Sequence, residues 1–219
     1  GVMYGVVDFY KACQKEGIKP LIGMETYVAP RSMRDREGSQ DRDYGHLILL
    51  CKNQTGYENL MYLSSEAFLN GFYYRPRIDY DLLEQHCEGL VCLSACLAGD
   101  IPQALLQNNY DGALAYAKRL QRMFGEDFYI ELQNHGIPEQ LQVLPGLRKI
   151  AAEIGAKCVA TNDLHYVSSD DAEAQDVLLC IQTQRFVDEP DRTRMAGNQF
   201  YLKSQAELLP ATPHAPEAD

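Results

Sequence analysis

The chain has 219 residues, and its hydrophobic fraction of 46% is typical of one globular domain with a sizeable core. A formal net charge of −11 and the lack of a basic stripe argue against a free-standing nucleic-acid-binding protein, because Lys and Arg make the contacts to phosphates. The chain shows neither an apolar stretch long enough to cross a membrane nor a signal peptide, so we expect a cytoplasmic protein without a membrane partner.

The first predicted helix covers about residues 3–16, because apolar side chains recur on one helical face. They are Val6, Val7, Tyr10 and Cys13. A strand over residues 18–27 follows, and Glu25 is a carboxylate within its apolar pattern. Since a buried carboxylate without a partner is costly, we expect Glu25 either to pair with a base or to bind a cation.

The next segment, residues 31–43, is strongly charged and is typical of a solvated loop. Residues 44–51 then predict an apolar strand with His46 at its start. Functional side chains of a parallel barrel gather at the carboxyl ends of its strands. The pattern alone therefore favours a core or capping role for His46.

A helix over residues 56–70 leads into residues 72–77, where two arginines stand among three aromatic side chains. Such a loop can stack on single-stranded bases or hold phosphates. A rim packed on the core is the more common use of this composition, and we prefer that interpretation. Asp79 is expected to cap a helix over residues 80–86.

Residues 89–94 predict a buried strand, and Cys96 lies in the loop after it. A thiolate in such a loop can bind zinc, although a lone cysteine is more often inert. Two helices are expected next, over residues 101–107 and 112–124. The alternating residues 127–133 predict a strand that leads into His135, at the carboxyl end where sites are usually found.

The most informative stretch is Ala160-Thr161-Asn162-Asp163-Leu164-His165-Tyr166. It closes a short apolar run over residues 156–160, which we interpret as a buried strand after a helix over 139–153. At a strand period of two, Asp163 and His165 point the same way, and a carboxylate beside an imidazole suits a divalent metal or a hydrolytic site. Taken alone, the stretch is interpreted equally well as a capping Asp and a His bonded to a backbone carbonyl.

The last predicted elements are a helix over residues 170–181 and a strand over 199–203. We expect Val177, Leu178 and Ile181 to face inward from that helix. A Pro-rich tail over residues 209–219 is expected to begin a connection to a further domain. Seven cysteines without a C-x-x-C pair indicate core filling in a reducing compartment rather than a disulfide framework.

Strands and helices alternate at least four times, which favours an α/β fold with a parallel sheet or barrel and helices outside. Polar candidates follow the ends of several strands, where they come together at one edge of such a sheet. They are Cys96, His135, Asp163 and His165. This coincidence predicts a metal site.

The chain resembles the PHP (polymerase and histidinol phosphatase) domain, in the form found at the amino end of bacterial DNA polymerase III alpha subunits. The matching stretches occur in the family's order across nearly the whole chain. They are Gly1-Val2-Met3-Tyr4-Gly5, Lys19-Pro20-Leu21-Ile22-Gly23-Met24-Glu25, His46-Leu47-Ile48-Leu49-Leu50, Leu93-Ser94-Ala95-Cys96-Leu97-Ala98-Gly99, Glu131-Leu132-Gln133-Asn134-His135-Gly136, Ala160-Thr161-Asn162-Asp163-Leu164-His165-Tyr166 and Phe200-Tyr201-Leu202-Lys203-Ser204.

This resemblance implies a distorted (β/α)7 barrel over residues 1–208 and a cluster of three divalent metals, which are zinc, manganese or magnesium. The implied metal ligands, matched position by position, are Glu25, His46, Cys96, Asp163 and His165. Asp163 and His165 are also the candidate catalytic residues. His135 lies in a matching stretch without being a family ligand, so we expect it to support a ligand without touching the metal.

The family's His-x-His, an acidic ligand and a Thr-Asp-His that should precede Gly1 are absent. The resemblance therefore implies four further ligands outside this chain, and an isolated fragment that neither closes its barrel nor holds three metals. Such a fragment is expected to be inactive.

In the complete protein, the resemblance implies chromosomal DNA synthesis, with this domain acting as a metal-dependent 3′–5′ exonuclease or as structural support for proofreading. The implied partners are primer–template DNA, the sliding clamp and a proofreading subunit. The alternatives are a stand-alone PHP-family phosphoesterase acting on a small phosphorylated substrate and a replisome-binding module without turnover.

Overall fold

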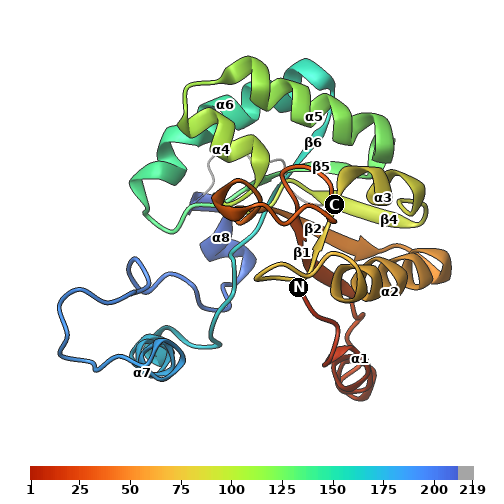
Figure 1. The fold of residues 1–219 in the computed structure, drawn as a ribbon. Helices are drawn as coiled ribbons and strands as arrows, with labels where there is room; N and C mark the ends of the chain where they lie inside the picture. The colour runs from red at the N-terminus through yellow and green to blue at the C-terminus, as the bar shows by residue number, and fades with distance from the viewer. Residues whose placement is uncertain (212–219) are drawn as a thin grey trace.

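The computed structural model describes residues 1–211, which form a six-stranded sheet covered by helices (Figure 1). The strands are β1 (Gly23–Val28), β2 (Gly45–Cys51), β3 (Arg77–Ile78), β4 (Leu90–Leu93), β5 (Phe128–Leu132) and β6 (Lys157–Ala160). The α-helices are α1 (Val6–Lys15), α2 (Gln54–Leu69), α3 (Tyr80–Gln85), α4 (Asp100–Leu106), α5 (Tyr110–Phe124), α6 (Pro138–Ile154), α7 (Ala172–Thr183) and α8 (Gln205–Ala211). No helix of residues 1–211 has both the length and the apolar character that a membrane span needs.

Strand β2 runs antiparallel to both of its neighbours in the sheet order β3-β1-β2-β4-β5-β6, whereas the other neighbouring pairs are parallel. The prediction of an all-parallel sheet is therefore wrong for this half of the chain. Parallel neighbours need a crossover, usually a helix, but the segment between β1 and β2 contains only one 3-10 turn, Gly38–Asp41. The sheet is open within the described residues, so the structure shows a mixed α/β fold rather than a closed barrel.

The two faces of β1 and β2 differ in burial because side chains alternate along a strand. Met24 and Val28 of β1 are buried, as are Leu47 and Leu49 of β2, and each such leucine stabilises the fold by about 1.5–3 kcal/mol. This face forms one core with helices α2, α4, α5 and α6. The opposite face carries the polar side chains described below.

Several predicted elements are confirmed to within a few residues. Helices α2 to α6 correspond to the predictions at residues 56–70, 80–86, 101–107, 112–124 and 139–153. Asp79 caps α3 as expected, because its carboxylate accepts a hydrogen bond of 2.9 Å from the backbone N–H of Leu82.

Two predictions in the last part of the chain are wrong. Helix α7 exposes Val177, Leu178 and Ile181, and buries Cys180 instead. The predicted strand over residues 199–203 is only an isolated bridge between Tyr166 and Tyr201. The connection over residues 209–219 stays a prediction, since α8 extends to Ala211 and the rest lies outside the described residues.

The charged loop over residues 31–43 is not simply solvated, because it encloses the guanidinium of Arg77. Arg77 is fully buried and donates to the backbone carbonyls of Met33, Asp35, Asp41 and Gly71. The same loop buries Asp41, which accepts two hydrogen bonds from Arg31 at 2.9 and 2.7 Å. Arg77 therefore holds the loop against β3 through the loop's backbone carbonyls, and the Arg31–Asp41 pair ties the loop to itself.

Candidate metal centre

Side chains from three segments meet on one face of the sheet, at its central strands β1, β2 and β4. Glu25 lies in β1, His46 begins β2 and Cys96 lies in the loop after β4. The imidazole Nδ1 of His46 is 2.8 Å from Glu25 Oε1 and 3.8 Å from Cys96 Sγ. One oxygen, one nitrogen and one sulfur thus lie within 4.8 Å of one another, which is a spacing that one metal ion can bridge.

The antiparallel pairing explains why His46 belongs to this group. The start of β2 lies beside the ends of β1 and β4, with Tyr27 opposite His46 and Glu25 two positions away on the same face. The backbone N–H of His46 also donates to the carbonyl of Ala98, which ties β2 to the loop that carries Cys96. The core or capping role that the pattern favoured for His46 assumed a parallel strand, and that assumption is wrong.

The electrostatics of the group favour a cation. The hydrogen bond from His46 lowers the pKa of Glu25, although partial burial acts in the opposite direction. Burial raises the pKa of Cys96 to about 11, and the nearby carboxylates of Asp163, Glu25 and Glu131 add to this effect. Because a bound cation favours the thiolate, metal binding here would displace the thiol proton. Glu25 is 44% exposed, so the expected cost of a buried charge does not apply to it.

Asp163 and His165 lie beyond the end of β6 and outside the compact three-residue group. Asp163 has a left-handed backbone with φ of 45°, so the strand period of two does not hold at this point. Its Oδ1 is 3.9 Å from Nδ1 of His165, which also lies 2.7 Å from the carbonyl oxygen of Asp163. Both residues remain near enough to act electrostatically, Asp163 on Cys96 and His165 on Glu25.

His135 is buried and positions the backbone just before Asp163. Its Nε2 is 2.6 Å from the carbonyl oxygen of Asn162, and its Nδ1 is 2.8 Å from Nε2 of Gln140. The ring stacks on Phe200 with centroids 4.4 Å apart. It is not part of the three-residue group, so its contacts are those of a side chain that holds the Asp163 segment in place.

Glu131 is a functional candidate that was not singled out from the sequence. It is 4% exposed, and its Oε1 accepts hydrogen bonds from Thr161 and from Gln133. Among residues 1–211, its Oε2 has no hydrogen-bond partner, and burial raises the pKa of this carboxyl group. Glu131 could have been found from the sequence, because it is a glutamate within an apolar strand pattern, as Glu25 is.

The residues present fit a divalent metal. Carboxylate, imidazole and thiolate are the ligands that zinc takes in proteins, and carboxylates also suit manganese and magnesium. Backbone strain occurs beside two of the candidate ligands, because Ala95 has φ of 65° next to Cys96 and Asp163 itself has φ of 45°. A non-glycine residue in this region costs roughly 1–2 kcal/mol and is often found at functional sites.

Comparisons with known proteins show which family the chain resembles. Residues 1–135 match the family model of the PHP domain. The chain is 48% identical to DNA polymerase III subunit alpha of Treponema pallidum, over 99% of the chain and 19% of that relative. It is 45% identical to the protein of the same name from Thermus aquaticus, over 100% of the chain and 18% of the relative. The chain thus spans about a fifth of the length of the curated relatives it matches.

Proposed function

The chain belongs to the PHP-domain family, and on that premise we propose that it is part of a bacterial DNA polymerase III alpha subunit, which synthesises DNA in chromosome replication. Sequence identity of 37–48% to alpha subunits over at least 97% of the chain supports this assignment. Residues 1–208 would be the PHP domain and 209–219 the start of a connection toward the polymerase palm. The strands that close a (β/α)7 barrel would come from elsewhere in the complete protein.

Within that protein, the domain would be a metal-dependent phosphoesterase that removes nucleotides from a 3′ end. The convergence of Glu25, His46 and Cys96 on one face of the central strands carries this proposal. These three side chains would hold a cation, and Asp163 and His165 would complete its ligands from the end of β6. A bound divalent cation lowers the pKa of a water and balances the charge of the phosphate. We expect zinc, manganese or magnesium, with three ions in the complete domain.

The implied partners follow from the same assignment. The complete protein would bind primer–template DNA and would assemble with a sliding clamp and a proofreading subunit in the cytoplasm. If the domain has lost turnover, it would serve as structural support for that proofreading subunit. The position of Asp163 and His165 outside the compact group is the observation that favours this second function.

The test is a 3′–5′ exonuclease assay of the full-length parent protein on a mispaired primer, with and without a chelator. We expect chelator-sensitive activity that Asp163→Ala abolishes. Asp111→Ala, at an exposed position in the first turn of α5, is the matched control and should retain activity. Negligible nuclease activity in all three proteins, with intact polymerisation, would leave only the structural function.

A further inference from the structure

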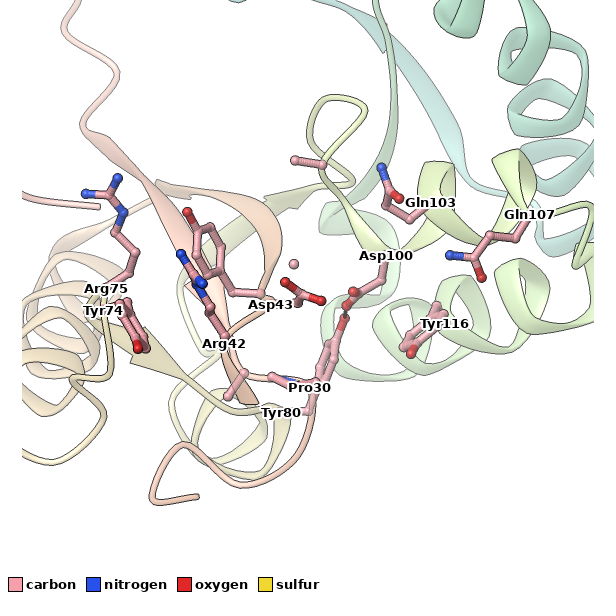
Figure 2. Close-up of a pocket in the computed structure, with 14 residues that line it drawn as sticks. Pro30, Arg42, Asp43, Tyr74, Arg75, Tyr80, Asp100, Gln103, Gln107 and Tyr116 are labelled. Carbon is pink, nitrogen blue, oxygen red and sulfur yellow. Dashed lines mark hydrogen bonds between the residues drawn. The ribbon is translucent and has the colours of Figure 1, made fainter. Parts of the chain in front are cut away.

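A cavity of about 790 Å³ lies beside the metal group and takes no part in holding the metal. Figure 2 shows it between the loop residues Arg42 and Arg75 on one side and helices α4 and α5 on the other. Its volume is in the range of protein sites for small ligands, which is roughly 300–1,000 Å³.

One side of the cavity is basic and aromatic. Arg42 lies over the ring of Tyr74, with the guanidinium carbon 5.0 Å from the ring centroid, and Arg75 is hydrogen-bonded to the side chain of Tyr44. Both arginines are exposed, and neither is paired with a carboxylate in a salt bridge among residues 1–211. Two guanidinium groups that are held by tyrosine side chains can bind a phosphate. The free faces of the tyrosine rings remain available for stacking on a base.

The opposite side offers hydrogen-bonding groups from α4 and its surroundings. Gln103, Gln107 and Asp100 line it, and Asp43 lies between them and the arginines (Figure 2). Asp100 accepts a hydrogen bond of 2.5 Å from the hydroxyl of the buried Tyr80, and burial raises its pKa. The side-chain amides of Gln103 and Gln107 supply both donors and acceptors. The cavity therefore separates a phosphate-binding side from a side suited to the edge of a base.

The cavity shares a wall with the metal group. The ring of Tyr44 is parallel to that of His46, with an interplanar angle of 1° and centroids 5.7 Å apart. Ala98, which lines the cavity, accepts the backbone hydrogen bond of His46. A ligand in the cavity would thus lie next to the face of the strand pair that holds Glu25 and His46.

We propose that this cavity binds one nucleotide of a single-stranded DNA end, with its phosphate on Arg42 and Arg75 and its base toward Gln103 and Gln107. That the ligand is DNA rests on the proposed function. The cavity would be the site that guides the DNA end to the metal group. The loop over residues 72–77 then contributes Tyr74 and Arg75 to nucleic acid, whereas Arg77 is buried and makes no such contact.

The experiment uses the full-length parent protein in chelator, so that binding is measured without cleavage. A single-stranded oligonucleotide with 4-thiothymidine at its 3′ end is photocrosslinked, and the crosslinked peptides are mapped by mass spectrometry. Because the base is placed toward Gln103 and Gln107, we expect crosslinks in the peptides that carry these residues or Tyr116, which line that side of the cavity. The double substitution Arg42→Ala, Arg75→Ala should reduce their yield at least about tenfold, because each arginine–phosphate contact is a charge-assisted hydrogen bond.

Arg34→Ala is the matched control, because Arg34 is exposed in the same charged loop but does not line the cavity. Far-UV circular dichroism and thermal unfolding should be the same for the variants and the wild type, which shows that the variants are folded. Cavity crosslinks that depend on the two arginines, in a protein without nuclease activity, would support this binding site and contradict the proposed exonuclease. Crosslinks confined to other peptides, or unchanged in the double variant, would overturn the inference.

Discussion

His46 Nδ1 lies 2.8 Å from Glu25 Oε1 because β1 and β2 run antiparallel, which brings the start of one strand beside the other strand's carboxylate. The two atoms are the ones that would bind a shared cation, and without a cation they contact each other directly. Substituting either residue should therefore affect metal content more than stability, since neither side chain belongs to the buried core.

The first prediction concerns that metal. In the full-length parent protein, His46→Ala and Cys96→Ser should each weaken zinc or manganese binding by more than about 100-fold, because losing even a side chain that only orients a ligand costs 10–100-fold. Metal content after dialysis, measured by mass spectrometry, checks this. Cys13→Ser on α1 is the matched control for the thiol and should bind metal normally. Unchanged metal content in both site variants would contradict the assignment of these ligands.

A second prediction concerns Arg77, whose guanidinium is enclosed by four backbone carbonyls. Arg77→Met should lower the free energy of unfolding by about 3–5 kcal/mol, because it leaves buried acceptors without donors. Arg75→Ala, two residues earlier and exposed, should change it by less than about 0.5 kcal/mol. Urea denaturation of each protein gives both values. Equal stability of the two variants would show that the loop finds other donors.

Much of the site was predictable from the sequence, whereas its assembly was not. Cys96 and Asp163 follow predicted strand ends, and Glu25 is a carboxylate within an apolar strand pattern, so each could be singled out from the sequence. The relative direction of two neighbouring strands depends on the segment that connects them. The composition of the charged loop between β1 and β2 does not indicate that this connection lacks a crossover helix. The burial of Arg77 could not be predicted either. The carbonyls that its guanidinium binds come from residues 33–41 and from Gly71, which are distant in sequence, and the charged residues 31–43 alone indicate a solvated loop.

The face of α7 was predicted incorrectly for a related reason. Its apolar residues follow a helical period, but a period shows which side chains share a face and not whether anything covers that face. Val177, Leu178 and Ile181 are exposed within the described residues. Helices α2 and α5 were predicted correctly because the sheet covers their apolar faces.

A third prediction follows from Glu131, whose carboxyl pKa is raised by burial and whose Oε2 has no hydrogen-bond partner among residues 1–211. Glu131→Gln keeps the shape and an acceptor for Thr161, so it should change the free energy of unfolding by less than about 1 kcal/mol. Glu131→Ala should cost about 2–3 kcal/mol, because Thr161 and Gln133 lose their shared acceptor. Chemical denaturation at pH 7 measures both. A Gln variant as unstable as the Ala variant would mean that the charged carboxylate is required.

The last prediction concerns acid stability and the ion pair between Arg31 and Asp41. Hydrogen bonds from Arg31 lower the pKa of Asp41 below its value in the unfolded chain, which is about 3.9. The folded state therefore binds fewer protons at this residue, and the stabilisation is complete above pH 4 and is lost as pH falls through the folded pKa. Asp41→Asn should be less stable than the wild type at pH 7, and the difference should shrink between pH 4 and pH 2.

Thermal unfolding between pH 4 and pH 2 tests this prediction. Asp35→Asn is the control, because Asp35 lies 3.7 Å from Arg31 at the edge of the same loop and is more exposed. A constant difference between Asp41→Asn and the wild type down to pH 2 would mean that Asp41 acts through its shape and not its charge.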